Sequence, residues 1–298
     1  MQALPLAPTA CGEPVGRHGR MKFSLILCTL GRTTELARFL EHLDRQTYRN
    51  FELVVVDQNP EGLLDPVLAP YRDHFQVVHV RSKLRGLSRA RNLGLAHLSG
   101  DIVAFPDDDC WYSPDILEQV AQSLQRHPDR NGLTCRCVDE SGSDAFNKFD
   151  SAGGDVTKYN VWRRSNSNCI FLSARFVAAA RQFNEDLGKG TASDTAAEEM
   201  DFLLRGMQTG LQVLYCPDFH VYHRLKVPSY DEAGTREARS HATGQGYVLR
   251  QYGYWFPYVV YFCSRPLGGM LVALATGNSG RFRYHLAMMQ GRLRGWIG

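Results

Sequence analysis

Three adjacent aspartates, Asp107, Asp108 and Asp109, have the clearest capacity for chemistry in this sequence of 298 residues. They follow the apolar run 101–105 and Pro106, so they lie where a predicted buried strand ends. Neighbouring carboxylates repel one another, and a hard divalent ion shares its coordination between carboxylate and phosphate oxygens. The triplet therefore predicts a site for Mg²⁺ or Mn²⁺ with a phosphorylated ligand. The alternative is a solvated acidic turn, because acids are also favourable near a helix N-terminus.

A second acidic group, Glu198, Glu199 and Asp201, occupies the first turns of a helix predicted over 196–207. A carboxylate at the edge of a pocket can take a proton from an attacking hydroxyl. Acids at a helix start are also common partners of the helix dipole, so a structural role is the alternative.

The segment 86–94 places Arg89, Arg91 and Asn92 at the start of another predicted helix. Helix N-termini and arginine side chains both suit phosphate, although two arginines on a helix also make an ordinary solvated face. Farther along, His223 ends the segment 217–223 and offers an imidazole to a metal already bound by carboxylate. A lone histidine at the surface is the alternative there.

These side chains need elements that bring them together. Apolar runs at 22–29, 51–56, 77–80 and 101–105 read as strands, and amphipathic stretches such as 33–45 read as helices between them. Strands that alternate with helices favour a mostly parallel sheet covered on both faces. Ligands collect at the carboxyl ends of such strands, which is where Thr29, Asp57 and the triplet lie. Further helices are predicted from Ser113 and from Ser173, and a short strand over 211–215.

The order and spacing of these motifs resemble glycosyltransferase family 2. The matching pieces lie within residues 22–225, at 24–29, 53–57, 86–92, 105–109, 198–201 and 217–223. The resemblance implies a GT-A fold, an α/β Rossmann-like mixed sheet with helices on both faces, here followed by a helical C-terminal tail.

The resemblance also implies roles for individual residues. The nucleotide-sugar donor is expected to contact Thr29, Gly31, Arg32, Asp57, Arg89, Arg91, Asn92, Asp107 and Asp108. The metal, Mg²⁺ or Mn²⁺, is expected on Asp107, Asp109 and His223, with Asp109 favoured as the direct ligand and Asp108 open to a role in shaping the turn. Glu199 is the preferred base, although Glu stands where the family usually has Asp, which leaves Glu198 and Asp201 as alternatives.

The implied reaction is inverting. The base deprotonates an acceptor hydroxyl, and the metal neutralises the departing diphosphate. The Gln-x-x-Arg-Trp signature of processive synthases is missing from the sequence, so a transferase that adds one sugar is favoured. After Asp57 the chain continues with Gln58-Asn59 rather than with the commoner Asp-Gly-Ser type of loop. The identity of the donor nucleotide is therefore left open.

Residues 1–20 are read as an extension without a cleaved signal, 21–230 as the transferase domain and 231–298 as a separate tail. The eight cysteines are scattered without a C-x-x-C pair, which favours a reducing cytosol. From residue 238 onward there are seven arginines and no lysine or acid, so this part carries +7 and the rest 3 − 7 = −4.

The tail contains two apolar runs, 254–263 and 267–275, which Arg265 and Pro266 separate. We expect these runs to lie on an anionic membrane surface, with a helical hairpin packed on the domain as the alternative. No nucleic-acid motif is present, so nucleic acid is not an expected partner. The expected acceptor is a glycan linked to a lipid such as polyprenyl diphosphate, in bacterial surface-polysaccharide assembly. The expected location is cytoplasmic, peripheral on the inner face of the plasma membrane; homo-oligomerisation stays open.

Two other functions compete with this one. A nucleotidyltransferase also combines an α/β domain with acidic metal ligands, but the loop 29–33 is poor in the glycines that its phosphate loop needs. A catalytically inactive nucleotide-sugar-binding protein is the other alternative, against which the intact acidic residues argue.

Overall fold

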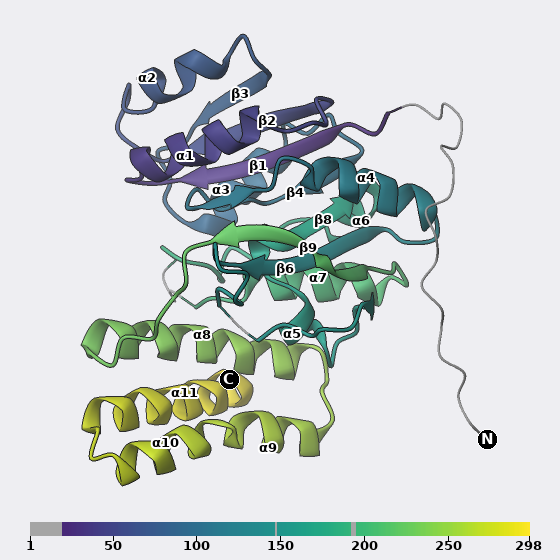
Figure 1. Cartoon of the computed structure of the whole chain (residues 1–298). Coiled ribbons are helices and arrows are strands. Elements are labelled where there is room, and N and C mark those ends of the chain that lie inside the picture. Colours follow the sequence, from purple (N-terminus) through teal and green to yellow (C-terminus); the bar gives the residue numbers. More distant parts are fainter. Residues whose placement is uncertain (1–19, 147, 192–194) are drawn as a thin grey trace, which may run out of the picture.

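A computed structural model describes residues 20–146, 148–191 and 195–298. The predicted extension 1–20 therefore lies, apart from its last residue, outside the described residues. The described strands form a nine-stranded mixed sheet in the order β3-β2-β1-β4-β8-β6-β9-β5, and β7 pairs with β9 (Figure 1). The strands are β1 (Phe23–Thr29), β2 (Phe51–Asp57), β3 (Gln76–Arg81), β4 (Ile102–Ala104), β5 (Cys110–Tyr112), β6 (Gly132–Val138), β7 (Gly154–Asp155), β8 (Ile170–Ser173) and β9 (Leu214–His223).

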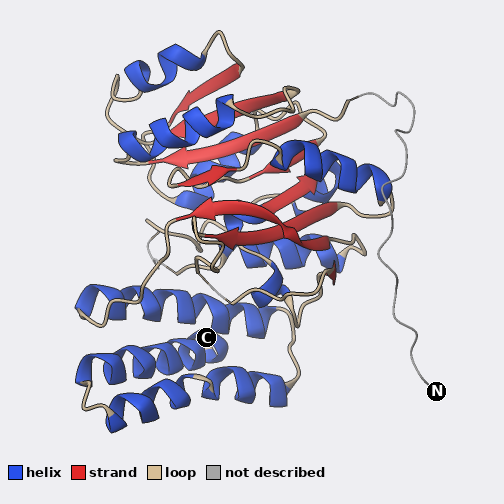
Figure 2. Cartoon of the chain, in the orientation of Figure 1, coloured by secondary structure: helices blue, strands red, loops and turns tan. Residues whose placement is uncertain are grey.

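The first four strands are parallel, and β8 begins the antiparallel part of the sheet. Thr29 pairs with Asp57 where β1 and β2 end, and Cys28 forms an isolated bridge with Asp107. The predicted strand ends therefore do meet at one edge of the sheet. Figure 2 shows helices on both faces, so the predicted α/β architecture is confirmed.

The helices predicted over 33–45 and 196–207 and from Ser173 are found within two residues of those positions, whereas the other helices were predicted with other bounds or without bounds. The described helices are α1 (Thr33–Asp44), α2 (Asp65–Leu68), α3 (Leu87–Leu95), α4 (Ile116–Arg126), α5 (Val161–Arg164), α6 (Ala174–Ala180), α7 (Glu198–Gln208), α8 (Glu232–Gln251), α9 (Phe256–Ser264), α10 (Pro266–Ala275) and α11 (Ser279–Ile297), with two 3₁₀ turns at Ala69–Tyr71 and Ser167–Cys169. Ser173 caps α6 by accepting a hydrogen bond from the Phe176 N–H, as its position predicts.

Two elements near the triplet differ from the prediction. The short strand β5 lies between Asp109 and α4, so that helix starts at Ile116 rather than at Ser113. The strand predicted over 211–215 is shifted and much longer, because Pro217 does not end β9. The pairing of β9 with β6 shifts register between Cys135 and Arg136, next to this proline, and such an irregularity accommodates a residue that has no N–H to donate.

The C-terminal helices α8 to α11 form a layer below the sheet in Figure 1. Helices α8 and α11 approach closely because Gly295 has no side chain there: a Cβ atom would lie 1.9 Å from the Thr243 carbonyl oxygen. Val248 and Leu249 of α8 are fully buried and belong to the same apolar cluster as the core of the sheet. The tail therefore packs on the domain through α8 and through α9, where Tyr258 and Phe262 contact Tyr159 and Trp162, while α10 lies on the outside of the layer.

Candidate active site

Asp108, the middle residue of the triplet, points into the protein. Its carboxylate accepts a hydrogen bond from Thr29 Oγ1 at 2.7 Å and forms an ion pair with Arg32 Nη1 at 2.8 Å. Burial raises the pKa of Asp108 to about 6, although both partners oppose that shift. Through these two contacts, Asp108 fixes the turn of the triplet to the end of β1 and to the loop that follows β1.

Asp109 lies against His223, with 3.3 Å between Oδ1 and Nε2, because β5 and β9 pair Cys110 with His223. Burial acts to raise the pKa of Asp109, but the hydrogen bond with His223 and the charge of Arg32 outweigh it and lower the pKa. For His223 burial acts in the opposite direction, and the contact with Asp109 raises its pKa. The other ring nitrogen of His223, Nδ1, lies 2.6 Å from the Arg224 carbonyl oxygen, and this contact fixes the orientation of the imidazole.

Carboxylate and imidazole together suit Mn²⁺, and carboxylate suits Mg²⁺. Within the described residues no group of three or more Asp, Glu, His or Cys side chains is arranged to hold an ion. Mg²⁺ at phosphate-transfer sites is often held by one or two carboxylates, with substrate phosphates and waters completing the shell. Asp109 and His223 therefore fit a metal that shares its coordination with a bound diphosphate.

Asp107 connects the triplet to the second acidic group. It accepts a hydrogen bond from Ser167 Oγ at 3.1 Å and lies 3.4 Å from Arg91 Nη2. Arg91 is almost completely buried, and its Nη1 forms an ion pair with Glu198 Oε1 at 2.8 Å. Arg91 thus joins the two acidic groups that the sequence places 91 residues apart.

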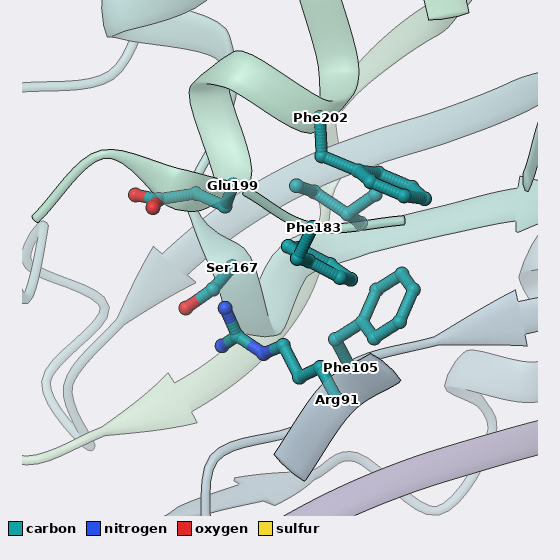
Figure 3. A pocket seen from close by; sticks show the side chains of 7 residues that line it. Arg91, Phe105, Ser167, Phe183, Glu199 and Phe202 are labelled. Atoms are coloured by element: carbon teal, nitrogen blue, oxygen red, sulfur yellow. The ribbon is translucent and has the colours of Figure 1, made fainter. Parts of the chain in front are cut away.

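Glu199 is half-buried and lines a small pocket with Arg91, Ile170, Ser167 and the rings of Phe105, Phe183 and Phe202. In Figure 3 its carboxylate and the Ser167 hydroxyl lie toward one side, whereas the three phenylalanine rings lie toward the other. Burial is the main cause that raises the pKa of Glu199 to about 8, and the charge of Glu198 adds to it, while Arg91 opposes. A carboxylate with such a pKa is a competent general base near neutral pH.

Asp201 faces away from this pocket. Its Oδ2 forms an ion pair with Arg205, and its Oδ1 lies 2.8 Å from the Tyr252 hydroxyl of the C-terminal layer. Of the three candidate bases, Glu198 is therefore engaged by Arg91 and Asp201 by Arg205 and Tyr252. Glu199 is the one that lines the pocket.

Asp57 is buried at the end of β2, and both of its carboxylate oxygens have partners. His79 Nε2 lies 2.8 Å from Oδ2, while the side chain of Asn59 donates to Oδ1 at 2.8 Å. Asn59 also accepts a hydrogen bond from the Gly31 N–H, so this network ties the ends of β1 and β2 together. Asp57, Gly31 and Arg32 thus lie around one edge of the sheet.

The structure does not bring Arg89 or Asn92 to the acidic triplet. Arg89 forms an ion pair with Glu185 at 3.1 Å, and Asn92 holds the backbone of Phe183 through both its amide nitrogen and its amide oxygen. Both residues therefore fix the segment that carries Phe183, the central ring of the pocket. Of the three polar residues predicted for phosphate in 86–94, only Arg91 reaches the triplet.

Ser167, His79 and Tyr252 have site contacts that the sequence did not reveal. Ser167 belongs to the segment 139–170, part of which lines the pocket of Glu199. Another part of that segment, 139–141, lines an open cleft of about 730 Å³ with Trp111 and Arg224, the neighbours of the Asp109–His223 pair. Short polar residues in irregular segments carry no periodic signal, so only the fold identifies them.

Comparisons with known proteins agree with this geometry. The model of "Glycosyl transferase family 2" matches residues 24–187. An uncharacterized glycosyltransferase of Bacillus subtilis, YwdF, is 32% identical over 105 residues, which are 35% of this chain and 39% of that protein. The glucosyl-dolichyl phosphate glucuronosyltransferase of Haloferax volcanii is 34% identical over 219 residues, which are 69% of this chain and 70% of that protein.

Among solved structures, the mannosyltransferase PcManGT of Pyrobaculum calidifontis, in complex with GDP-Man and Mn²⁺, has the same fold. It superposes with a TM-score of 0.60 at 15% identity and covers 92% of this chain and 88% of its own. This superposition and the mixed sheet of the chain agree with the GT-A fold that the resemblance implied. The family match covers more than half of the chain, and the chain is a glycosyltransferase that belongs to family 2.

Proposed function

We propose that the protein transfers one sugar, with inversion, from a nucleoside-diphosphate sugar to a hydroxyl of a lipid-linked glycan, with Glu199 as base. The observation that carries the proposal is the position of Arg91. It contacts Asp107 of the triplet and Glu198 next to the base, so one buried side chain sets the two acidic groups beside each other. A donor that lies along the triplet has its sugar within the region that Glu199 lines.

In the proposed reaction, Glu199 takes the proton of the acceptor hydroxyl. The acceptor oxygen forms a bond to the anomeric carbon while the bond from that carbon to the diphosphate breaks, and the nucleoside diphosphate leaves with the electron pair. Asp109 and His223 would hold Mg²⁺ or Mn²⁺, which when bound supplies positive charge to the leaving diphosphate. Arg91 keeps Glu198 in its ion pair, and Phe105, Phe183 and Phe202 exclude water from behind Glu199.

The donor site is proposed along the carboxyl ends of β1 and β2, at Thr29, Gly31, Arg32 and Asp57. The complex of the neighbour with GDP-Man and Mn²⁺ supports a nucleotide-sugar donor and a metal. The acceptor is proposed to lie between the two parts of the segment 139–170 that line the pocket and the cleft. The name of the Haloferax relative, which includes a glucosyl-dolichyl phosphate, supports a lipid-linked acceptor.

A peripheral position on the cytoplasmic face of the membrane is proposed from the outer surface of the C-terminal layer. An exposed apolar stripe runs along α9 and α10, formed by Phe256, Val260, Leu267, Leu271 and Leu274. By length and composition alone, the stretch Phe256–Ala275 also suffices to cross a bilayer, and 28% of its apolar window is buried. We favour a stretch that lies flat, because Val259 and Phe262 are buried on the opposite side and Arg292 donates to the Phe262 carbonyl oxygen at 2.6 Å.

The proposed function is tested by a screen of UDP-, GDP- and dTDP-sugars with lipid-linked glycan acceptors, in Mn²⁺ or Mg²⁺ and in EDTA. Release of nucleoside diphosphate that depends on metal and acceptor, together with a product of inverted anomeric configuration, is expected. Turnover that EDTA leaves unchanged would remove the metal from the mechanism, and a product with retained configuration would remove Glu199 as base.

A further inference from the structure

Tyr252 directly follows the last residue of α8 and caps the C-terminus of that helix. Its side chain contacts the first turn of α7. Its hydroxyl lies 2.7 Å from the backbone carbonyl oxygen of Asp201 and 2.8 Å from Asp201 Oδ1. Tyr252 is 8% exposed and Asp201 3%, so this contact is shielded from water. Because Arg205 holds the other oxygen of Asp201, the carboxylate is fixed from two sides. Asp201 is two residues after Glu199, within the same helical turn.

A second contact between α8 and this turn depends on a glycine. At Gly244 a Cβ atom would lie 1.7 Å from the Ala196 carbonyl oxygen and 3.1 Å from Ala197 Cβ, so α8 presses directly on the backbone before α7. Ala197, the residue before Glu198, has φ 84° in the left-handed region. That conformation is unfavourable for a residue with a side chain, so surrounding contacts must hold it.

Helix α8 also holds the other wall of the pocket. The Tyr247 hydroxyl accepts a hydrogen bond from Asn184 Nδ2 at 3.3 Å, and Asn184 directly follows Phe183. The same helix is thus connected to the turn that carries Glu199 and to the segment that carries Phe183, whose ring also lines the pocket. Both connections come from a part of the chain that begins after residue 231, outside the matched family region 24–187.

We propose that α8 is the element that positions the catalytic turn, with Tyr252 as a positioning residue for Glu199. The proposal rests on the proposed role of Glu199 as base. Tyr252 does not line the pocket; its hydroxyl fixes Asp201, and Asp201 belongs to the turn from which Glu199 lines the pocket. The C-terminal layer is therefore part of the catalytic framework as well as a surface for the membrane.

The test is Tyr252→Phe in the full chain, with Tyr254→Phe as the matched control. Tyr254 lies in the same layer, is equally buried, and donates its hydroxyl hydrogen to the Lys158 carbonyl oxygen, away from α7. Tyr252→Phe is expected to lower kcat about 10- to 100-fold while the donor KM changes less than about twofold, since only the geometry of the base changes. Tyr254→Phe is expected to keep kcat within about twofold at a comparable loss of Tm.

The pH profile separates positioning from loss of stability. Glu199 faces Glu198 on its own helix, Arg91 on α3 and Asp107 after β4. A loosened turn admits water to Glu199, so the acid limb of the kcat profile is expected to move to lower pH in Tyr252→Phe and to stay in place in Tyr254→Phe. Equal profiles and equal kcat for the two variants would overturn the proposal.

A glycine pair gives an independent measurement. Gly244→Ala is expected to lower kcat through displacement of the turn, whereas Gly268→Ala on α10 meets no atom within 4 Å and is expected to keep it. If Gly244→Ala does not fold, the comparison of Tyr252→Phe with Tyr254→Phe still tests the positioning role. Glu199→Gln separates the two proposals. If this variant keeps full activity, Glu199 is not the base. If it is inactive while Tyr252→Phe behaves like Tyr254→Phe, only the positioning role of Tyr252 fails.

Discussion

Arg91 and Glu198 form an ion pair of 2.8 Å in which both side chains are almost completely shielded from solvent. Removal of one partner from such a pair leaves an uncompensated buried charge and typically costs about 3–5 kcal/mol. This pair is therefore a fixed part of the framework. It explains why two neighbouring glutamates of α7 have different roles: Glu198 anchors the helix to α3, and Glu199 remains available to an acceptor.

Glu199→Gln is expected to lower kcat at least about 100-fold, because the amide cannot accept the proton of the acceptor hydroxyl. The same change is expected to stabilise the fold at alkaline pH. The folded-state pKa of about 8 exceeds the ordinary value of 4.5, so the contribution of Glu199 to stability is lost as pH rises through this range. The Tm difference between variant and wild type should grow from pH 5 to pH 9. A variant less stable than wild type at pH 9 would contradict the raised pKa, and one that keeps full activity would contradict the role of Glu199 as base.

The wild-type enzyme is expected to become more active as pH rises toward about 8. Only the deprotonated form of Glu199 can act as base, and its pKa is about 8. The measurement is kcat from pH 6 to pH 9 at saturating donor, acceptor and metal. An acid limb near pH 4.5, the ordinary value for glutamate, would show that the pocket does not perturb the base.

Asp109→Asn and His223→Gln are expected to weaken Mn²⁺ binding about 10- to 100-fold and to lower activity with it. Binding is measured directly by titration of Mn²⁺ in the presence of nucleoside diphosphate, observed by electron paramagnetic resonance. His74→Gln is the control, because His74 forms a solvent-accessible pair with Asp44 at the C-terminal end of α1. Unchanged Mn²⁺ affinity in both active-site variants would place the metal elsewhere.

A double substitution, Leu271→Glu with Phe256→Glu, is expected to abolish binding to vesicles that contain anionic lipid. Both side chains are more than 60% exposed, so the fold should tolerate the change. Val227→Glu, an equally exposed position outside the C-terminal layer, is the control. Co-flotation with phosphatidylglycerol vesicles is the measurement, and persistent flotation of the double variant would contradict the proposed surface.

Removal of residues 238–298 is expected to prevent folding rather than to release a soluble, active domain. The deletion takes away Val248, Leu249 and Phe262, which are buried in the same cluster as the core of the sheet. The packing free energy lost in this way exceeds the free energy of unfolding of a typical domain. Circular dichroism during heating should show no cooperative transition. A cooperative transition near the wild-type Tm would show that the layer is dispensable.

Much of the fold follows from the sequence because the central strands β1, β2 and β4 are buried on both faces. β1 and β2 read as continuous apolar runs, and their ends place Thr29, Asp57 and the triplet at one edge. The extent of β9 could not be predicted, since the register shift that tolerates Pro217 depends on β6, about 80 residues earlier. The pairing of Arg91 with Glu198 could not be predicted either, because charged residues on two helices give no sign of which partners meet.

The C-terminal tail shows most clearly what could not be predicted from the sequence. Its composition suggests a separate unit with its own task, and its charge of +7 supports that view. Tyr252 and Gly244 act at α7 without any local motif, since a lone tyrosine and a lone glycine in a helix are ordinary. Only their contacts reveal that α8 belongs with the site.

The stacking of helices in the C-terminal layer also has a geometric consequence. Helix α11 lies between α8 and the outer pair α9 and α10 (Figure 1), and packed helix axes lie about 8–10 Å apart. If α9 and α10 rest on a bilayer as proposed, α11 and α8 lie between the headgroups and the catalytic turn on α7, so the layer acts as a spacer several helix diameters thick. An acceptor must then extend its reactive hydroxyl over that height, so the combined reach of its lipid phosphate and its sugars decides whether it enters the site.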